Sequence, residues 1–253
     1  MRVRMLPSAV AGHDLEFLTT FIVNGTVAID AGALGFWGDL DGQQRVGHVF
    51  LSHSHADHVC SLPMFVTNTL AGRARNLVVH GHAPVLDSLE RDLFNGRLWP
   101  DFLHATSERA PLLDLDETVE GRVCEVAGLR ITPIRVNHPV PTIAHLVDDG
   151  DAAVVISTDS APTSELWRAA ARVPHLKGVF LGASFPEEEE SLARAAGHLT
   201  PSQVDAEISK LDRNVPVFAV HIKPGHRQAV VDQLRALARP NLSIGQSHAD
   251  YVF

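Results

Sequence analysis

The sequence predicts an α/β fold in which β-sheets pack together and helices cover them on the outside. Short apolar runs bounded by Gly, Asp and Asn dominate the first third and the middle of the chain, as is typical of strands. From residue 163 onward, stretches with helical spacing alternate with apolar strands. The chain has 253 residues, 45% of them hydrophobic, so it can bury a substantial core. We therefore expect residues 1–253 to form a single domain.

The first part of the chain is predicted to be rich in strands. Asn24-Gly25-Thr26 is a strong hairpin signal between the first two of them. A helix is expected at residues 83–95, with Pro84 in its first turn and Asn95-Gly96 at its end. The predicted strands cover residues 17–23, 27–32, 48–52, 121–126, 129–136, 142–148 and 152–158, with a turn at 148–151 joining the last two.

The last third is predicted to alternate helices and strands. The acidic run at residues 187–190 is expected to be an exposed first helical turn, where negative charge suits the helix dipole. The predicted helices cover residues 163–173, 201–212 and 227–238, and the predicted strands cover residues 178–184 and 215–222.

Charge and cysteine content exclude several classes of protein. The net charge is −9 and no run of Lys or Arg occurs, which argues against binding to a nucleic-acid polymer. Cys60 and Cys124 form no Cys-x-x-Cys pair, so neither a disulfide framework nor a thiolate zinc site is expected. The first residues lack the apolar stretch of a signal peptide, and no segment has eighteen uninterrupted apolar residues. We expect a cytoplasmic protein without a membrane partner.

A dense group of potential metal ligands follows the apolar run at residues 48–52. Within "FLSHSHADHVC", His53, His55, Asp57 and His58 lie close together. Residues i and i+2 of an extended backbone point to the same side, so His53 and His55 can reach one ion. Asp57 and His58 follow where the chain is expected to turn into a helix, and they can serve a second ion. The alternative is a polar surface turn that contains histidines.

Three more candidate ligands lie where later apolar strands end. His138 follows residues 129–136, Asp159 follows residues 152–158, and His221 ends the apolar run that begins at residue 215. Functional groups are often displayed where a strand gives way to a loop. A lone histidine in such a place is usually structural, but four ligand-bearing strand ends in one chain favour a shared metal site.

These residues resemble the metallo-β-lactamase-fold superfamily, whose hallmark is His-x-His-x-Asp-His followed by distant His, Asp and His. The resemblance runs from about residue 17 to the C-terminus. It implies an αββα sandwich of two mixed β-sheets flanked by helices, with the site along one edge and Asp30 supporting the metal loop rather than binding metal. It also implies two metal sites: His53, His55 and His138 would bind one ion, Asp57, His58 and His221 the other, and Asp159 would bridge them.

Two further phrases narrow the resemblance to one branch. "GHLTP" (197–201) and "HIKPG" (221–225) are similar to class II 3′,5′-cyclic-nucleotide phosphodiesterases, which carry Gly-His-Leu-Thr-Pro and His-Ile-Lys-Pro in this order. Two positions depart from that pattern. Ala56 stands where the signature usually has Leu. Gly182 stands where an acidic residue usually precedes Ser-Phe, and that carboxylate would help to orient His198.

The resemblance implies a dinuclear, metal-dependent phosphodiesterase that hydrolyses cyclic nucleotides (cAMP or cGMP) to 5′-nucleotides. Two divalent metal ions are the expected cofactors, Zn²⁺ in the first place, with Mn²⁺ or Fe also suited to such ligands. A metal-bridging hydroxide would attack phosphorus, Asp57 would orient it, and His198 would stabilise or protonate the 3′ leaving oxygen. The alternative for His198 is a capping or supporting role near Thr200. Lys223 is either a phosphate contact or a surface lysine.

Other functions are left open by the sequence. The alternatives are another hydrolase of this fold, such as a tRNA 3′-end phosphodiesterase or a lactone or thioester hydrolase, and a non-catalytic nucleotide- or metal-binding relative. The expected partner is a small-molecule phosphodiester, and a homodimer is left open. His80 and His82, two residues apart, are expected to be a structural pair at a strand end, since no carboxylate or third ligand accompanies them. The alternative is that they line the pocket.

Overall fold

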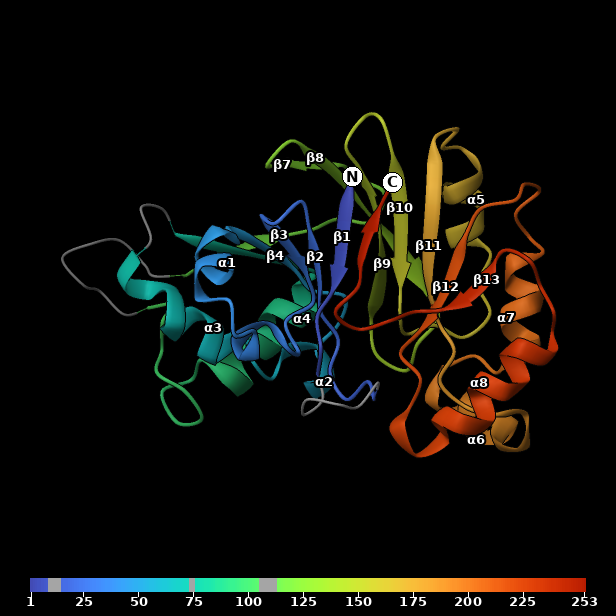
Figure 1. Ribbon diagram of the computed structural model, residues 1–253. Coiled ribbons are helices and arrows are strands. Elements are labelled where there is room, and N and C mark those ends of the chain that lie inside the picture. The colour runs from blue at the N-terminus through green and yellow to red at the C-terminus, as the bar shows by residue number, and fades with distance from the viewer. Residues whose placement is uncertain (9–14, 73–75, 105–112) are drawn as a thin grey trace.

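The computed structural model describes residues 1–8, 15–72, 76–104 and 113–253. These residues form two seven-stranded β-sheets that pack face to face, with helices on both outer faces (Figure 1). Each sheet contains both parallel and antiparallel strand pairs. The predicted αββα sandwich of two mixed sheets is therefore confirmed.

The first sheet is built from the N-terminal part of the chain and one C-terminal strand. Its strand order is β14-β1-β2-β3-β4-β5-β6. The pairs from β14 to β3 are antiparallel, and the pairs from β3 to β6 are parallel. The strands are β1 (Arg2–Met5), β2 (Phe21–Val23), β3 (Val27–Ile29), β4 (His48–Phe50), β5 (Leu77–Gly81), β6 (Leu113–Glu117) and β14 (Asp250–Val252).

The second sheet repeats this arrangement with the later part of the chain. Its strand order is β13-β12-β11-β10-β9-β8-β7. The pairs from β7 to β10 are antiparallel, and the pairs from β10 to β13 are parallel. The strands are β7 (Cys124–Val126), β8 (Leu129–Val136), β9 (Thr142–Asp148), β10 (Ala153–Ser157), β11 (Leu176–Gly182), β12 (Val217–Val220) and β13 (Leu242–Ile244).

Helices cover the outer face of each sheet (Figure 1). Among the described residues, no helix combines the length and the apolar character needed to cross a membrane. Beside the first sheet lie α1 (Leu40–Arg45), α2 (Ala56–Val59), α3 (Leu62–Thr69) and α4 (Ala83–Ser88), and beside the second lie α5 (Glu165–Ala171), α6 (Glu190–Ala196), α7 (Pro201–Ile208) and α8 (Arg227–Ala236).

Alternation of side chains along the strands produces three apolar layers. Phe21 of β2 packs between the sheets with Phe180 of β11, their ring centroids 5.2 Å apart, whereas the next residue, Ile22, packs on the helix-covered side. Side chains of successive strand residues point to opposite faces, so an uninterrupted apolar strand can serve two cores at once. A third cluster joins the second sheet to its helices through residues such as Trp167 and Val204.

Most predicted elements are present, with ends that differ by a few residues. The predicted strands 129–136 and 142–148 coincide with β8 and β9. The Asn24-Gly25 hairpin is confirmed, since both residues adopt the left-handed conformation with φ of 47° and 73°. The helix expected at 83–95 is α4, continued by a wider π-helical turn over Leu89–Leu93. The acidic run at 187–190 forms a 3₁₀ turn that leads into α6.

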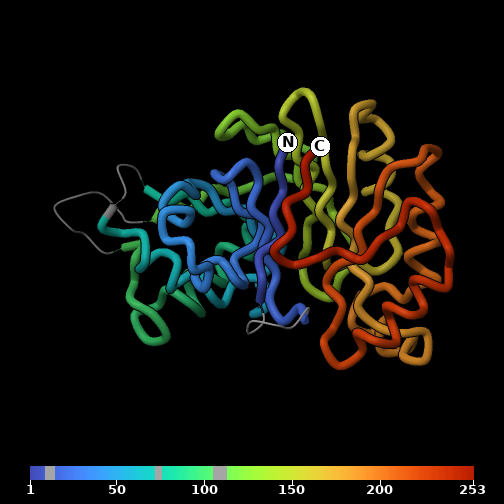
Figure 2. Tube along the Cα trace, in the orientation of Figure 1, coloured from blue at the N-terminus to red at the C-terminus, as the bar shows by residue number. Residues whose placement is uncertain are grey.

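The elements that were not predicted are short or polar. β6 (LDLDE) is an edge strand that buries Leu113 and exposes its acidic end. β1 carries Arg2 and Arg4, which pair with Asp250 of β14 at 2.5 and 2.7 Å. Figure 2 shows these two strands side by side, with both chain ends at the same place. Strands β1 and β14 are stabilised by pairing with each other across almost the whole chain, so no local sequence pattern predicts them. Strand β13 and helices α1 and α3 were also missed.

His145 of β9 is a buried histidine in the layer between the sheets. Its side chain is 1% exposed, and neither ring nitrogen has a hydrogen-bond partner among the described residues. The edge of its ring faces Phe50, at a centroid distance of 5.9 Å. Burial lowers the pKa of His145 to about 4, so the ring is neutral in the folded protein at neutral pH.

The neutral state of His145 should make folding stability depend on pH. In the unfolded chain His145 is protonated below the ordinary histidine pKa of 6.5, whereas in the folded chain it is protonated only below about pH 4. The folded state therefore loses stability as the pH falls from 6.5 to about 4. The free energy of unfolding should therefore fall between about pH 7.5 and about pH 5 in the wild type. In His145→Leu this fall should be smaller by roughly 2 kcal/mol. Urea unfolding at both pH values measures this loss. Equal losses in the two proteins would show that His145 plays no part.

Candidate metal centre

All seven predicted ligands lie at one end of the sandwich, on segments that follow strands of both sheets. His53, His55, Asp57 and His58 follow β4 and extend into α2, which is at the lower centre of Figure 1. From the second sheet, the ligands follow β8 (His138), β10 (Asp159) and β12 (His221). Segments far apart in the sequence therefore supply a single cluster.

Asp159 is at the centre of this cluster. Its Oδ1 atom lies 3.2 Å from His58 Nε2 and 3.3 Å from His221 Nε2. Its Oδ2 atom lies 3.8 Å from His53 Nε2 and 3.9 Å from His138 Nε2. The carboxylate thus faces histidines of both halves of the predicted site, as a bridging ligand would.

The donor atoms form two groups in which every atom lies within 4.8 Å of the others. This division matches the two ion sites that the sequence resemblance implied. One group contains His53, His55, His138 and Asp159, and the other contains Asp57, His58 and His221.

Most of the histidines are oriented through their Nδ1 atoms. Histidines that bind metal through one nitrogen usually have the other nitrogen hydrogen-bonded, which fixes the ring. His55 differs, because its Nδ1 atom lies 3.3 Å from His138 Nε2. The Nδ1 partners are Ser52 Oγ for His53 (2.9 Å), Asp30 Oδ2 for His58 (2.8 Å), the Gly197 carbonyl for His138 (3.1 Å) and Thr19 Oγ1 for His221 (3.0 Å).

The residues present fit divalent cations. His53 Nε2, His58 Nε2 and Asp159 Oδ1 are buried and have no hydrogen-bond partner among the described residues. Buried polar atoms are nearly always paired, so unpaired donors that converge on one point indicate a missing ligand. Imidazole nitrogens with carboxylate oxygens suit zinc, manganese or iron. The fold and these groups together imply divalent metal ions.

Electrostatic interactions in the cluster are strong because it is buried. Burial opposes the charged form of His58, but the Asp159 and Asp30 carboxylates raise its pKa well above the usual value. Burial likewise opposes ionisation of Asp159, yet His221 and His58 hold the pKa of this carboxyl well below its usual value. For His53, burial lowers the pKa. The charges in the cluster therefore favour the ionised form of Asp159 and the protonated form of His58.

Two residues near the centre have strained backbones. Asp30 and His221 are not glycines, yet their φ angles are 60° and 56°. Asp30 accepts hydrogen bonds from the Ser52 amide at 2.7 Å and the Ser52 hydroxyl at 2.9 Å, while the His221 amide donates to the buried Glu16 carboxylate. Burial raises the pKa of Glu16 to about 7. Such strain persists only where the surroundings enforce it, and it is common at functional sites.

Asp30 takes the supporting role that the resemblance implied. It binds His58 and Ser52 and belongs to neither donor group. Asp30→Asn should weaken metal binding by about 10–100-fold, because His58 loses its carboxylate acceptor. Competition titration with a zinc chelator measures the affinity, and the exposed Asp212→Asn is the matched control. Unchanged affinity in Asp30→Asn would contradict this role.

His198 lies beside the cluster, with its Nε2 atom 3.8 Å from Asp159 Oδ2. Ser184 Oγ donates its proton to the His221 carbonyl at 2.9 Å, so it accepts a hydrogen bond from His198 Nδ1, 3.1 Å away. Burial lowers the pKa of His198 to about 3. The neutral ring therefore presents the Nε2 lone pair to the centre. This nitrogen also lies within reach of an ion held by Asp159 and His221, which the sequence did not indicate.

Gly182 has a steric explanation. A Cβ atom at this position would lie 1.7 Å from the Thr158 carbonyl oxygen, so no side chain fits while β11 and the end of β10 pack this closely. The orienting partner of His198 is the Ser184 hydroxyl instead. The structure thus provides an anchor for His198 without the acidic residue whose absence the sequence had indicated.

Lys223 is partly exposed, and its ammonium group contacts the second donor group. Its Nζ atom is 3.2 Å from Asp57 Oδ2 and 2.9 Å from His221 Nε2. Burial opposes ionisation of Asp57, but His58, His221 and Lys223 together lower the pKa of this carboxyl. In this arrangement the ammonium contacts two of the three donors that a second ion would share.

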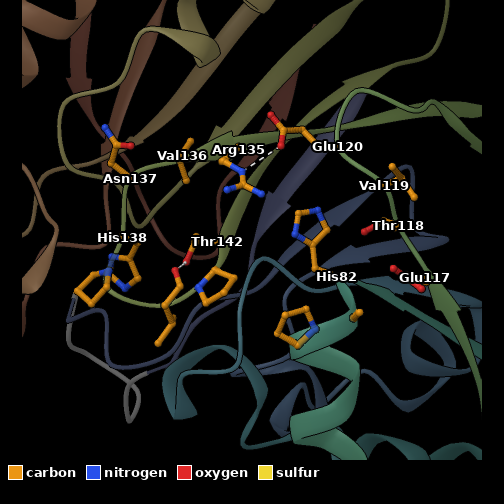
Figure 3. Close-up of a pocket in the computed structure, with 15 residues that line it drawn as sticks. His82, Glu117, Thr118, Val119, Glu120, Arg135, Val136, Asn137, His138 and Thr142 are labelled. Carbon is orange, nitrogen blue, oxygen red and sulfur yellow. Dashed lines mark hydrogen bonds and ion pairs between the residues drawn. The ribbon is translucent and has the colours of Figure 1, made fainter.

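A cleft of about 810 Å³ opens beside His138 (Figure 3). Thr142, Arg135 and His82 line it farther from the centre, and Arg135 is held by Glu120 at 3.0 Å. His82, for which the sequence favoured a structural role and left pocket lining as the alternative, lines this cleft. Apart from His138, the cleft residues carry no sequence motif, and they come from separate segments at the start of α4, after β6 and between β8 and β9. The supporting residues Thr19, Ser52 and Ser184 were missed for the same reason.

Comparison with known proteins agrees with this geometry. A sequence profile of the beta-lactamase superfamily domain matches residues 36–222. A probable 3′,5′-cyclic-nucleotide phosphodiesterase of Yersinia pestis is 23% identical over 211 residues, which is 74% of this chain and 60% of that protein. A ribonuclease Z of Porphyromonas gingivalis is 28% identical over 106 residues, which is 42% of this chain and 33% of that protein. The chain thus spans less than two thirds of either relative.

Among solved structures, unliganded yeast PDE1 has a TM-score of 0.77 to this chain. The two share 17% sequence identity, and the superposition covers 98% of each chain. At this level of identity the likeness is one of fold.

Proposed function

Because the chain belongs to the beta-lactamase superfamily, a superfamily of metal-dependent hydrolases, we propose that it hydrolyses a small phosphodiester, with 3′,5′-cyclic nucleotides as the substrate class. The observation that carries the proposal is the convergence of six donor side chains and His198 around a seventh donor, Asp159, beside an open cleft. A phosphodiester needs positive charge near its phosphate and an acid near its leaving oxygen, and this arrangement can supply both.

The cleft favours a small substrate over a polymer. Its volume of about 810 Å³ lies in the range of small-molecule pockets. The net charge of −9 opposes the approach of a long polyanion such as tRNA. The similarity to the cyclic-nucleotide enzyme of Yersinia pestis covers 74% of the chain, against 42% for the ribonuclease Z, and supports the same choice.

The chain's own residues have separate tasks in this proposal. His53, His55 and His138 would hold one divalent cation, and Asp57, His58 and His221 the other, with Asp159 between them. Bound cations would lower the pKa of a water molecule and neutralise charge on the phosphoryl group. The ionised Asp57 accepts a hydrogen bond from the attacking water and orients it toward phosphorus. Lys223, which lies beside Asp57 and His221, would pair with a phosphate oxygen of the substrate.

His198 would act on the leaving group. Its Nε2 lone pair faces the centre, and a bound phosphodiester brings a negative charge that favours protonation of the ring. The protonated Nε2 then donates to the 3′ oxygen as the P–O bond breaks. Ser184 keeps the ring in position through Nδ1 in both states.

The proposal is tested with protein reconstituted in zinc or manganese. Cyclic AMP, cyclic GMP, bis(p-nitrophenyl) phosphate, a tRNA precursor, a lactone and a thioester are offered in parallel, and product release is measured. We expect a 5′-nucleotide from at least one cyclic nucleotide, at a kcat/KM above that for tRNA. Faster cleavage of tRNA, lactone or thioester would assign the site to another substrate class. Stoichiometric metal without turnover of any substrate would indicate a binding protein.

Replacement of His198 separates proton transfer from metal binding. His198→Ala should lower kcat by about 10²–10⁴-fold and leave the bound metal unchanged. The control is His175→Ala, because His175 precedes β11 at the opposite end from the cluster. Metal content by mass spectrometry is the second measurement. Loss of one metal equivalent would make His198 a ligand, and wild-type turnover would remove it from the reaction.

A further inference from the structure

A second group of metal-binding side chains shares no residue with the centre described above. His80 on β5 is the direct cross-strand partner of Asp116 on β6, and Cys124 is the first residue of β7 in the other sheet. One donor atom from each of these three residues lies within 4.8 Å of the other two. β6 and β7 are edge strands of different sheets, so only the folded sandwich brings the three donors together.

The His80 ring is fixed in the manner of a ligand. Its Nδ1 atom is 2.8 Å from Asp116 Oδ2, and its Nε2 atom is 3.0 Å from His48 Nδ1. The ring is 3% exposed and stacks on Phe50 at a centroid distance of 4.1 Å. If Nδ1 bound an ion, Nε2 would donate to His48, which is the outer contact that metal-binding histidines usually have.

We propose that His80, Asp116 and Cys124 bind a divalent cation of the zinc class. Imidazole nitrogen, carboxylate oxygen and thiolate sulfur are the three donor types that Zn²⁺ accepts in tetrahedral sites. The Asp116 side chain is 54% exposed, so water can reach a fourth position. The sequence predicted no thiolate zinc site because Cys60 and Cys124 form no Cys-x-x-Cys pair, but this site needs a single thiolate, with partners supplied by neighbouring strands.

Binding at this site has a defined proton balance. The ion binds the thiolate, so the Cys124 thiol releases its proton to solvent. Burial, followed by the nearby Asp116 carboxylate, raises the pKa of the Cys124 thiol.

The location suggests a structural role. The chain leaves the first sheet at Thr118, whose amide bonds to the Gly81 carbonyl, and reaches the second at Gly121, whose amide bonds to the Pro133 carbonyl. An ion held by Asp116 and Cys124 would tie together the two sheet edges on either side of this crossing.

Cadmium tests the site without reference to activity. Metal-free, reduced protein is titrated with Cd²⁺, and the ultraviolet charge-transfer absorption of thiolate-bound cadmium is recorded. The donors of the other centre are histidines and aspartates, so this signal reports only a thiolate. We expect the final signal to correspond to one thiolate-bound cadmium per chain. Cys124→Ser should abolish this signal, and the variant should bind one cadmium ion fewer than the wild type.

Cys60→Ser is the matched control, because Cys60 is the other cysteine and its Sγ atom donates to the Gly32 carbonyl at 3.4 Å. This variant should retain the full signal.

Asp116→Asn leaves the thiol in place and alters only a half-exposed side chain. It should weaken the thiolate-dependent binding of cadmium at least about tenfold. His48→Phe should weaken it by about 10–100-fold. The proposal is overturned if the signal persists in Cys124→Ser, or if it is absent from the wild type at cadmium concentrations that fill the other centre.

Discussion

The buried Asp159 carboxylate is the constraint on which the rest of this end of the molecule depends. A buried charge is tolerated only when opposite charges or ions compensate it. Here the compensation comes from His58 and His221 at 3.2 and 3.3 Å, and these residues follow strands of different sheets. The sheets must therefore meet so that their strand ends surround one carboxylate. The left-handed backbones of Asp30 and His221 are the local strain that this convergence imposes.

The sequence revealed those parts of the molecule whose signal is local. β8 and β9 were predicted to the residue because long apolar stretches with clear turns define them. The ligands were found because each follows an apolar strand, and the resemblance then grouped them. The two-sheet architecture followed from the alternation of elements, whereas the sandwich itself came from the resemblance.

What could not be predicted depends on contacts between distant segments. β1 and β14 stabilise each other across nearly the entire chain. His80 was expected to have no carboxylate partner, but Asp116 is placed beside it by strand pairing across 36 residues. Lys223 was interpreted as a phosphate contact or a surface lysine, and only the fold shows that it lies between Asp57 and His221. The sequence indicated that an acidic residue at position 182 would orient His198, and Gly182 stands there instead. Close strand packing leaves no room for a side chain at this position, and the Ser184 hydroxyl contacts His198.

The position of β14 has a consequence for biosynthesis. Six strands of the first sheet come from residues before 118, but the seventh comes from residues 250–252. During synthesis from the N-terminus, the β1 edge of this sheet therefore remains unpaired until residues 250–252 have been made. Exposed strand edges invite association with other chains. The nascent protein thus exposes this edge to association until β14 pairs with β1.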